Sequence, residues 1–365
     1  MVSNLGVRVL LASFILVTDL VSSVVPSEPP SLSMTGSFRS IDGNYLPNVA
    51  ASDLTVTEDQ RPGGKIIAIE SMIGVSRQFC IAIGRNHAID ERLEFQKTLA
   101  QKFLREVVQR KSDTAVVFTY NVRTVEKLSR RNGRTFDATI AGVRGEGGRP
   151  DTKQAPFSSG FVIDGRSGGL AGSWYRQLMN GVYSRGNLVR FTEAAYQVSD
   201  GGAGMALAHC AAWFEEQKSP SSARFVVLFA DDQWGTAIVP AQMANRMLQM
   251  EAAQFYAFGF NEGIVSKPSM NNEPEQPQRH LNHVLQFIAS GTGGAAYFAS
   301  GAVHKEKLPS LESVRDQFNA LKRVIYVPTR SAQNGSDPHS LNVEYLPDKL
   351  VRVSLPTAFY PPSMN

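Results

Sequence analysis

Two short apolar segments, each ending in a loop and followed by a helical pattern, constrain the fold of this chain more than any other feature. The segments span residues 78–83 and 224–229, and amphipathic patterns over 90–110 and 240–252 follow them. Repeated units of strand, loop and crossover helix indicate a parallel α/β sheet, whose ligands bind at the carboxyl ends of the strands. We therefore expect loops 84–88 and 231–234 to lie at one crevice.

Both ends of the chain carry strand patterns in place of helical ones. Alternating apolar residues predict strands at 32–35, 54–57 and 66–69, and again at 324–327, 341–345 and 350–355. Neither end has enough strands for a stable independent sheet, so we expect the two ends to combine into one small β-sandwich. The expected division is an N-terminal β segment (24–75), an α/β domain (76–320) and a C-terminal β segment (321–365). A Gly-rich insert over 144–196 enters the α/β domain just before Gly201, and long inserts of this kind are usually functional or mobile.

Three loop motifs follow one another in the order of a known family. They read Gly84-Arg85-Asn86-His87-Ala88, then Gly201-Gly202-Ala203-Gly204, then Phe229-Ala230-Asp231. On these motifs, residues 78–300 resemble a von Willebrand factor A domain, and the mature chain resembles the secreted, VWFA-related (acidobacterial-type) bacterial family. The resemblance implies a Rossmann-like α/β fold, with a mainly parallel central sheet flanked by helices, and a role in protein binding.

The family's metal site uses Asp-x-Ser-x-Ser in the first loop, Thr in the second and Asp in the third. Here only Asp231 keeps its acid, while Gly84, Ala88 and Ala203 have no side-chain oxygen. A Mg²⁺-type site needs several hard oxygen ligands. We therefore predict a degenerate metal site, with Asn86 and Asp231 as vestigial ligands, and no bound metal or other cofactor.

The N-terminus resembles a signal peptide. Arg8 precedes an apolar stretch over 9–17, which is too short for a membrane span, and Val21-Ser22-Ser23 offers small residues for cleavage. A buried first strand is the alternative interpretation. We expect residues 1–23 to be removed, the mature chain to be secreted or periplasmic, and no later segment to span a membrane.

Charge argues against a nucleic-acid partner. The net charge is only +4, and the densest basic stretch, 123–134, also contains Glu126, so we interpret it as a solvated face.

The chain has two cysteines, Cys80 on an expected strand and Cys210 on an expected helix. Both should lie at a similar depth below the crevice, so they could face each other. When a helix packs on a sheet, the distance between two facing Cα atoms is near the upper limit that a disulfide can span. We therefore favour buried free thiols over a bridge.

Two motifs suggest other chemistry and are weaker. Gly165-Arg166-Ser167-Gly168-Gly169 fits the nucleophile elbow of serine hydrolases, but a Gly-rich chain produces this pattern by chance, and the elbow's usual preceding strand–helix units are missing. His280 and His283 lie three residues apart on an expected helix, with no third metal ligand in view.

The sequence therefore favours a non-enzymatic, exported binding protein whose partner is another protein. Aromatic and Arg side chains at a crevice suit a protein interface. The expected contact residues are Arg85, Asn86, His87, Gly202, Ala203, Asp231, Asp232 and Trp234. The alternatives are a structural component of a cell-envelope complex that uses the β-sandwich as its contact surface and, below it, a hydrolase that uses Ser167.

Overall fold

The structure, a computed structural model, describes eleven stretches of the chain. They are residues 31–85, 90–121, 124–128, 136–144, 202–217, 221–230, 241–261, 277–300, 310–329, 338–348 and 350–360. Within these stretches, no helix combines the length and apolar character that a membrane span requires.

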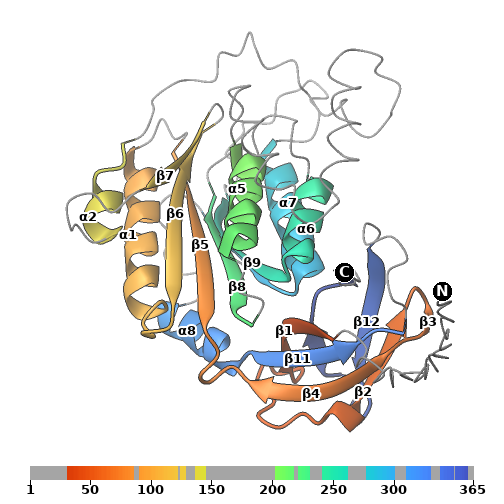
Figure 1. The fold of residues 1–365 in the computed structure, drawn as a ribbon. Helices are drawn as coiled ribbons and strands as arrows, with labels where there is room; N and C mark the ends of the chain where they lie inside the picture. The colour runs from red at the N-terminus through yellow and green to blue at the C-terminus, as the bar shows by residue number, and fades with distance from the viewer. Residues whose placement is uncertain are drawn as a thin grey trace, which may run out of the picture.

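Six strands of the described residues form one sheet, the central sheet, in the order β10-β9-β8-β5-β6-β7 (Figure 1). β5 (Arg77–Gly84) lies in its middle and runs parallel to β6 (Thr114–Tyr120) on one side and to β8 (Ala223–Phe229) on the other. Ile83 at the end of β5 pairs with Phe229 at the end of β8. The two expected loops thus begin side by side, as the sequence predicted.

The outer strands complete a doubly wound order. β9 (Ala253–Asn261) and β10 (Ala295–Ser300) continue the sheet in parallel beyond β8, and β7 (Val125–Leu128) forms an antiparallel edge beside β6. Counted along the chain, the sheet order is 6-5-4-1-2-3, which places its topological switch point between β5 and β8.

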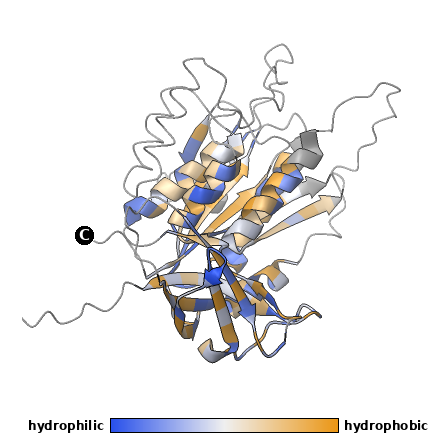
Figure 2. Cartoon of the chain, turned by 90° about the vertical axis from the view of Figure 1, so that its right-hand side faces the viewer, coloured by the Kyte–Doolittle hydropathy of each residue, from blue (hydrophilic) through white to orange (hydrophobic). Residues whose placement is uncertain are grey.

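Helices cover both faces of the central sheet because its strands are apolar on both faces. Every residue of β5 is buried. Its odd-numbered residues Phe79, Ile81 and Ile83 pack in one core cluster, whereas Cys80 and Ala82 pack in another. Figure 2 shows the strands of this sheet mostly in the hydrophobic colour, between helices that carry both colours.

One face carries three helices and the other carries the remaining described ones. The side of Cys80 is covered by α5 (Gly202–Gln217), α6 (Ala241–Met250) and α7 (Pro277–Thr292). The side of Phe79 is covered by α1 (Asp90–Glu106) and α8 (Leu311–Ala320), and α2 (Phe136–Ala141) packs against α1.

The two chain ends form two further antiparallel sheets of four described strands each. The first outer sheet has the order β13-β1-β11-β4 and the second has β14-β12-β2-β3. Side chains of both contribute to one apolar cluster, with Met34, Val324 and Tyr326 from the first sheet and Leu341 and Phe359 from the second. The strands are β1 (Leu32–Arg39), β2 (Leu54–Glu58), β3 (Arg61–Pro62), β4 (Lys65–Ser71), β11 (Lys322–Val327), β12 (His339–Tyr345), β13 (Arg352–Ser354) and β14 (Ala358–Phe359); a short 3-10 turn, η1 (Ala51–Asp53), precedes β2.

The outer sheets lie at the end of the central sheet opposite its carboxyl edge (Figure 1). Gln254, at the start of β9, is fully buried and donates from Nε2 to the carbonyl of Thr35 in β1 at 2.9 Å. A second contact comes from the C-terminal part of the chain, where the N–H of Thr357, just before β14, donates to the carbonyl of Gly291 in α7 at 3.0 Å. A surface on the outer sheets is therefore well separated from a surface at the carboxyl edge.

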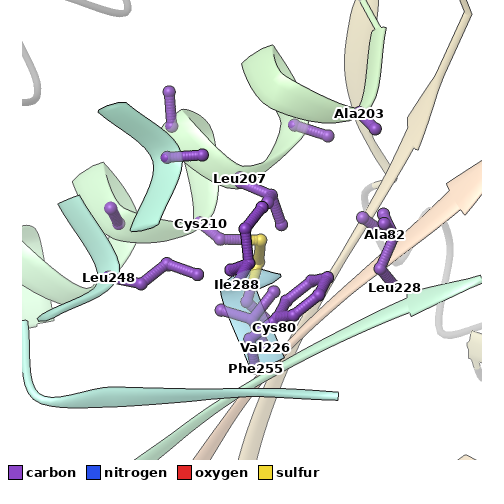
Figure 3. Packing of buried hydrophobic residues seen from close by; sticks show 14 of the residues in the cluster. Cys80, Ala82, Ala203, Leu207, Cys210, Val226, Leu228, Leu248, Phe255 and Ile288 are labelled. Atoms are coloured by element: carbon purple, nitrogen blue, oxygen red, sulfur yellow. A yellow bond between two sulfur atoms is a disulfide. The ribbon is translucent and has the colours of Figure 1, made fainter. Parts of the chain in front are cut away.

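Cys80 and Cys210 form a disulfide, so the expectation of free thiols is wrong (Figure 3). Their Cα atoms are 5.6 Å apart, well within the range for a bridge. The helix comes this close because Ala203 and Ala206, on the same face of α5 as Cys210, and Ala82, two residues after Cys80, are all small. A helix with alanines on its inner face lies closer to the sheet than helices ordinarily do, so the expected distance between the two Cα atoms was too long.

The second expected loop is also different from its prediction. Gly202, Ala203 and Gly204 form the first turn of α5. Gly202 has a φ of +87°, in the region that favours glycine, and this glycine lets the chain turn directly into the helix.

Candidate functional site

The described residues that meet at the switch point are here called the switch-point edge. They are Gly84 at the end of β5 and Arg85 after it, Asn121 and Thr124 in the adjacent turn between β6 and β7, Gly202 at the start of α5, and Ala230 after β8. In open α/β sheets, ligands bind at this position because adjacent loops diverge there to opposite faces of the sheet.

Arg85 brings a positive charge to this edge. Its main chain continues the strand pairing by donating to the Tyr120 carbonyl at 2.9 Å. Its Nη2 donates to Glu126 Oε1 at 2.8 Å and to Thr124 Oγ1 at 3.1 Å. The Arg85 side chain is only 10% exposed, whereas that of Glu126, on β7, is 53% exposed. The cation is thus built into the edge, and its acidic partner faces solvent.

Asn121 organises the turn that holds Arg85, although it belongs to none of the three predicted loop motifs. Its Oδ1 accepts from the Thr124 N–H at 2.7 Å and from the Thr124 hydroxyl at 3.2 Å. This local side-chain bonding is typical of Asn in tight turns. Asn121 directly follows β6, so applying the strand-end rule to this third strand would have found it.

The same asparagine connects the turn to α5. The Asn121 carbonyl accepts from the N–H of Gly202 at 2.5 Å. A continuous series of hydrogen bonds therefore runs from Gly202 through Asn121 and Thr124 to Arg85. The structure brings together the first and second expected motifs through a residue that belongs to neither.

Gln96 fixes the chain at the carboxyl end of β8. It lies on α1, is 1% exposed, and donates from Nε2 to the Ala230 carbonyl. The Ala230 N–H in turn donates to Phe258 in β9 at 2.9 Å. Both main-chain groups of the residue before Asp231 are therefore held, which sets the direction in which the chain leaves β8.

At the loop positions where the von Willebrand factor A pattern has metal ligands, the described residues carry no side-chain oxygen. Gly84 and Gly202 have no side chain, Ala203 is a fully buried methyl group, and Arg85 adds a positive charge. A hard cation needs carboxylate, hydroxyl or carbonyl oxygens in their place. Among the described residues, no three His, Cys, Asp or Glu side chains come together in a way that could hold a metal ion.

The clearest pKa shifts of the described groups lie below the edge or in the outer sheets. Burial on α5 lowers the pKa of His209 to about 4, so this imidazole is neutral at physiological pH. Burial raises the pKa of Tyr45 to about 12, and it also raises the pKa values of Tyr256 and Tyr297, on β9 and β10. These shifts reflect burial away from the edge, whereas perturbed groups at active sites usually face the substrate.

Several predicted site residues lie outside the described part of the chain. They are Asn86, His87, Asp231, Asp232 and Trp234, the motif around Ser167, and all but residue 144 of the insert. Of the histidine pair, His283 is an exposed residue of α7, which also includes His280. Arg85, Gly202 and Ala203 are the predicted contact residues that the structure describes.

The solved structures that are similar to this chain include two described as von Willebrand factor A proteins and a pilus adhesin. The von Willebrand factor type A protein from Catenulispora acidiphila is 10% identical, with a TM-score of 0.39, over 80% of this chain and 49% of that one. The SpRpn10 VWA domain is 11% identical, with a TM-score of 0.34, over 67% of this chain and 95% of that one. The pilus adhesin SpaC from Lactobacillus rhamnosus GG is 6% identical, with a TM-score of 0.37, over 76% of this chain and 35% of that one.

This chain spans about half the length of the first of these proteins. Because all three TM-scores are below 0.5, no function is transferred from them. No protein-family model matches the chain. No curated protein matches it either.

Proposed function

We propose that this protein is an exported, non-catalytic binding module that holds a protein partner at the switch-point edge. The observation that carries the proposal is the chemistry of that edge. A buried guanidinium, Arg85, lies at the end of the middle strand, and the neighbouring residues Gly84 and Ala203 offer no cation ligand. A degenerate metal site with a fixed positive charge suits an acidic group of a partner, because Arg binds carboxylates through charge-assisted hydrogen bonds.

The disulfide supports export. Bridges of this kind form and persist in oxidising compartments and are rare in the cytosol. The Cys80–Cys210 bridge therefore agrees with removal of residues 1–23 and a secreted or periplasmic mature chain. In this proposal residues 76–320 form the binding domain, and the two outer sheets form a β-sandwich that supports it from the opposite end.

The other predicted contact residues enter the proposal through their positions. Asn86 and His87 directly follow Arg85, and Asp231, Asp232 and Trp234 follow Ala230, whose main chain is held by Gln96 and Phe258. The insert 144–196 ends six residues before Gly202. We propose that these segments complete the contact surface.

The experiment is affinity capture from the cell envelope of the producing organism, quantified by mass spectrometry. The tagged parent is compared with Arg85→Gln and with a deletion of residues 160–185. Asn342→Ala with Glu344→Ala is the control, because both residues are exposed on β12 in the second outer sheet. Since buried Arg contacts dominate many interfaces, we expect each edge variant to capture at least about tenfold less partner than the parent does. The control should capture as much partner as the parent.

A second candidate function is a structural role in an envelope complex, with the outer sheets as the contact surface. The observation in its favour is the exposure of apolar side chains there. Ile67 on β4, Leu346 after β12 and Leu350 before β13 are each more than half exposed. Capture that is lost in the β12 control and kept in both edge variants, with all proteins melting cooperatively, would establish this function in place of the first.

A further inference from the structure

Arg85 and Glu126 form an asymmetric ion pair at the switch-point edge. The side chain of the cation is 10% exposed and that of the acid is 53% exposed. Two other arginine pairs at the opposite end of the central sheet are different, because both partners are buried. Arg77–Asp113 has side-chain exposures of 2% and 1%, and Arg224–Glu251 has 12% and 6%.

Among the described residues, the acid of the first buried pair is held from several directions, whereas Glu126 is held from one. Asp113 accepts from Arg77 Nε and Nη2 and also from the Arg110 N–H at 3.0 Å. Within the described residues, Glu126 accepts the 2.8 Å hydrogen bond from Arg85 Nη2, and its strand β7 is a four-residue edge. Rotation of its side chain into solvent therefore breaks little beyond that bond.

Arg85 itself stays in place when Glu126 leaves. Its main chain is paired with Tyr120, and its Nη2 is also bonded to Thr124, which Asn121 holds by two hydrogen bonds. Departure of Glu126 removes an ion-pair partner from a guanidinium with little exposure, which is destabilising. One carboxylate can thus replace another at this position, but a neutral group cannot.

We propose that Glu126 is an internal placeholder for a carboxylate of the partner protein, which displaces it from Arg85 on binding. This inference rests on the proposed function and deepens it, because it names the chemistry of the partner. The partner presents an Asp or Glu side chain or a C-terminal carboxylate to the switch-point edge. The exchange conserves the ion pair, so it selects acidic partners while the surrounding contacts supply most of the affinity.

The chain offers a matched control in Lys97 and Glu94 of α1. This pair is also asymmetric, with side-chain exposures of 7% and 65%, but it is an i,i+3 pair within one helix. Lys97 Nζ also donates to the Val143 carbonyl at 2.9 Å. Glu94→Gln therefore removes an exposed acid from a buried cation, as Glu126→Gln does, without changing the group bound to Arg85.

The test uses two short blocked peptides that differ only in one central residue, Glu or Gln. Their binding to the full mature chain is measured by NMR titration of the Arg85 side-chain signal. Removing a competing ion pair that is half exposed should tighten binding of the Glu peptide to Glu126→Gln by about two- to fivefold relative to the parent. The Gln peptide should gain nothing, and Glu94→Gln should bind both peptides as the parent does.

The proposal is overturned if Glu126→Gln binds the Glu peptide no better than the parent does, or if Glu94→Gln or the Gln peptide shows the same gain. Envelope capture with the same variants separates the two levels of the argument. If the Glu peptide binds Glu126→Gln more tightly but Arg85→Gln captures as much partner as the parent, the proposed function is refuted and the placeholder role of Glu126 is not. Capture that depends on Arg85 but ignores Glu126, with no gain for the Glu peptide, would refute the placeholder alone.

Discussion

Replacing Cys80 and Cys210 together by alanine should destabilise this protein by a large fraction of its total stability. The bridge joins residues 130 positions apart. In the chain-entropy description, a loop of that length lowers the entropy of the unfolded chain by about 17 cal/mol/K, which is about 5 kcal/mol at room temperature. Domains of ordinary stability unfold with about 5–15 kcal/mol, so the variant should be at or near the limit of folding.

Equilibrium urea unfolding of the parent and the Cys80→Ala, Cys210→Ala variant measures this difference. Both sulfur-bearing residues are fully buried, so reductant should leave the native parent intact. Once the parent is unfolded by urea, however, the reductant should cleave the bridge. The urea midpoint of the reduced parent should then be close to that of the variant. The variant itself should give the same transition with and without reductant.

Two results would refute the reasoning. Alkylation of the denatured, unreduced parent that adds two labels would show that the bridge does not form. A parent whose urea midpoint is the same with and without reductant, despite an intact bridge, would show that the cross-link does not constrain the unfolded state.

Further predictions concern metal, pH and processing. Millimolar Mg²⁺ or Mn²⁺ should leave the melting temperature unchanged, since a ligand that does not bind the native state cannot stabilise it; a rise of several degrees that disappears in Asp231→Ala would contradict this. Burial raises the pKa of Glu58, but hydrogen bonds from Thr329, Tyr326 and Gly64 outweigh it and hold the pKa below its ordinary value of 4.5. This carboxylate therefore stabilises the fold above pH 4.5, and the contribution is lost as the pH falls through the lowered pKa. In urea unfolding across this pH range, the free energy of unfolding should fall less steeply with decreasing pH in Glu58→Gln than in the parent. Equal slopes for the two proteins would refute the stabilising role of the Glu58 carboxylate. Mass spectrometry of the exported protein should find a mature chain that begins near Val24, and an intact Met1 would argue for the buried-strand interpretation.

The strand ends of the central sheet could be predicted from the sequence because their signals are local. The apolar runs that stop at Gly84 and Ala230 have the length and composition of buried strands, and both ends meet at the switch point. Helix α1 was likewise predicted from its apolar stripe, four residues too long at its C-terminal end. Six of the eight strands of the outer sheets were found for the same reason, but the two-residue strands β3 and β14 were not. The pairing of strands across the two chain ends is not a local property.

The parts of the site that were missed depend on contacts between distant residues. Asn121 matters because its carbonyl meets Gly202, and Gln96 because its amide reaches Ala230. Glu126 was interpreted as part of a solvated face, which its exposure supports, but its pairing with Arg85 is visible only when β7 is placed beside β6. The disulfide was missed because the approach distance depends on the alanine face of α5, which a general spacing ignores.

Photo-crosslinking in the living cell tests the location of the partner surface most directly. A photoreactive amino acid is placed at Lys127, exposed on β7 one residue from Glu126, and in a second protein at Glu344, exposed on β12 at the opposite end of the molecule. Binding at the switch-point edge predicts a cross-linked partner from position 127 that is lost when Arg85→Gln is added, and none from position 344. A partner captured only from position 344 would contradict the account.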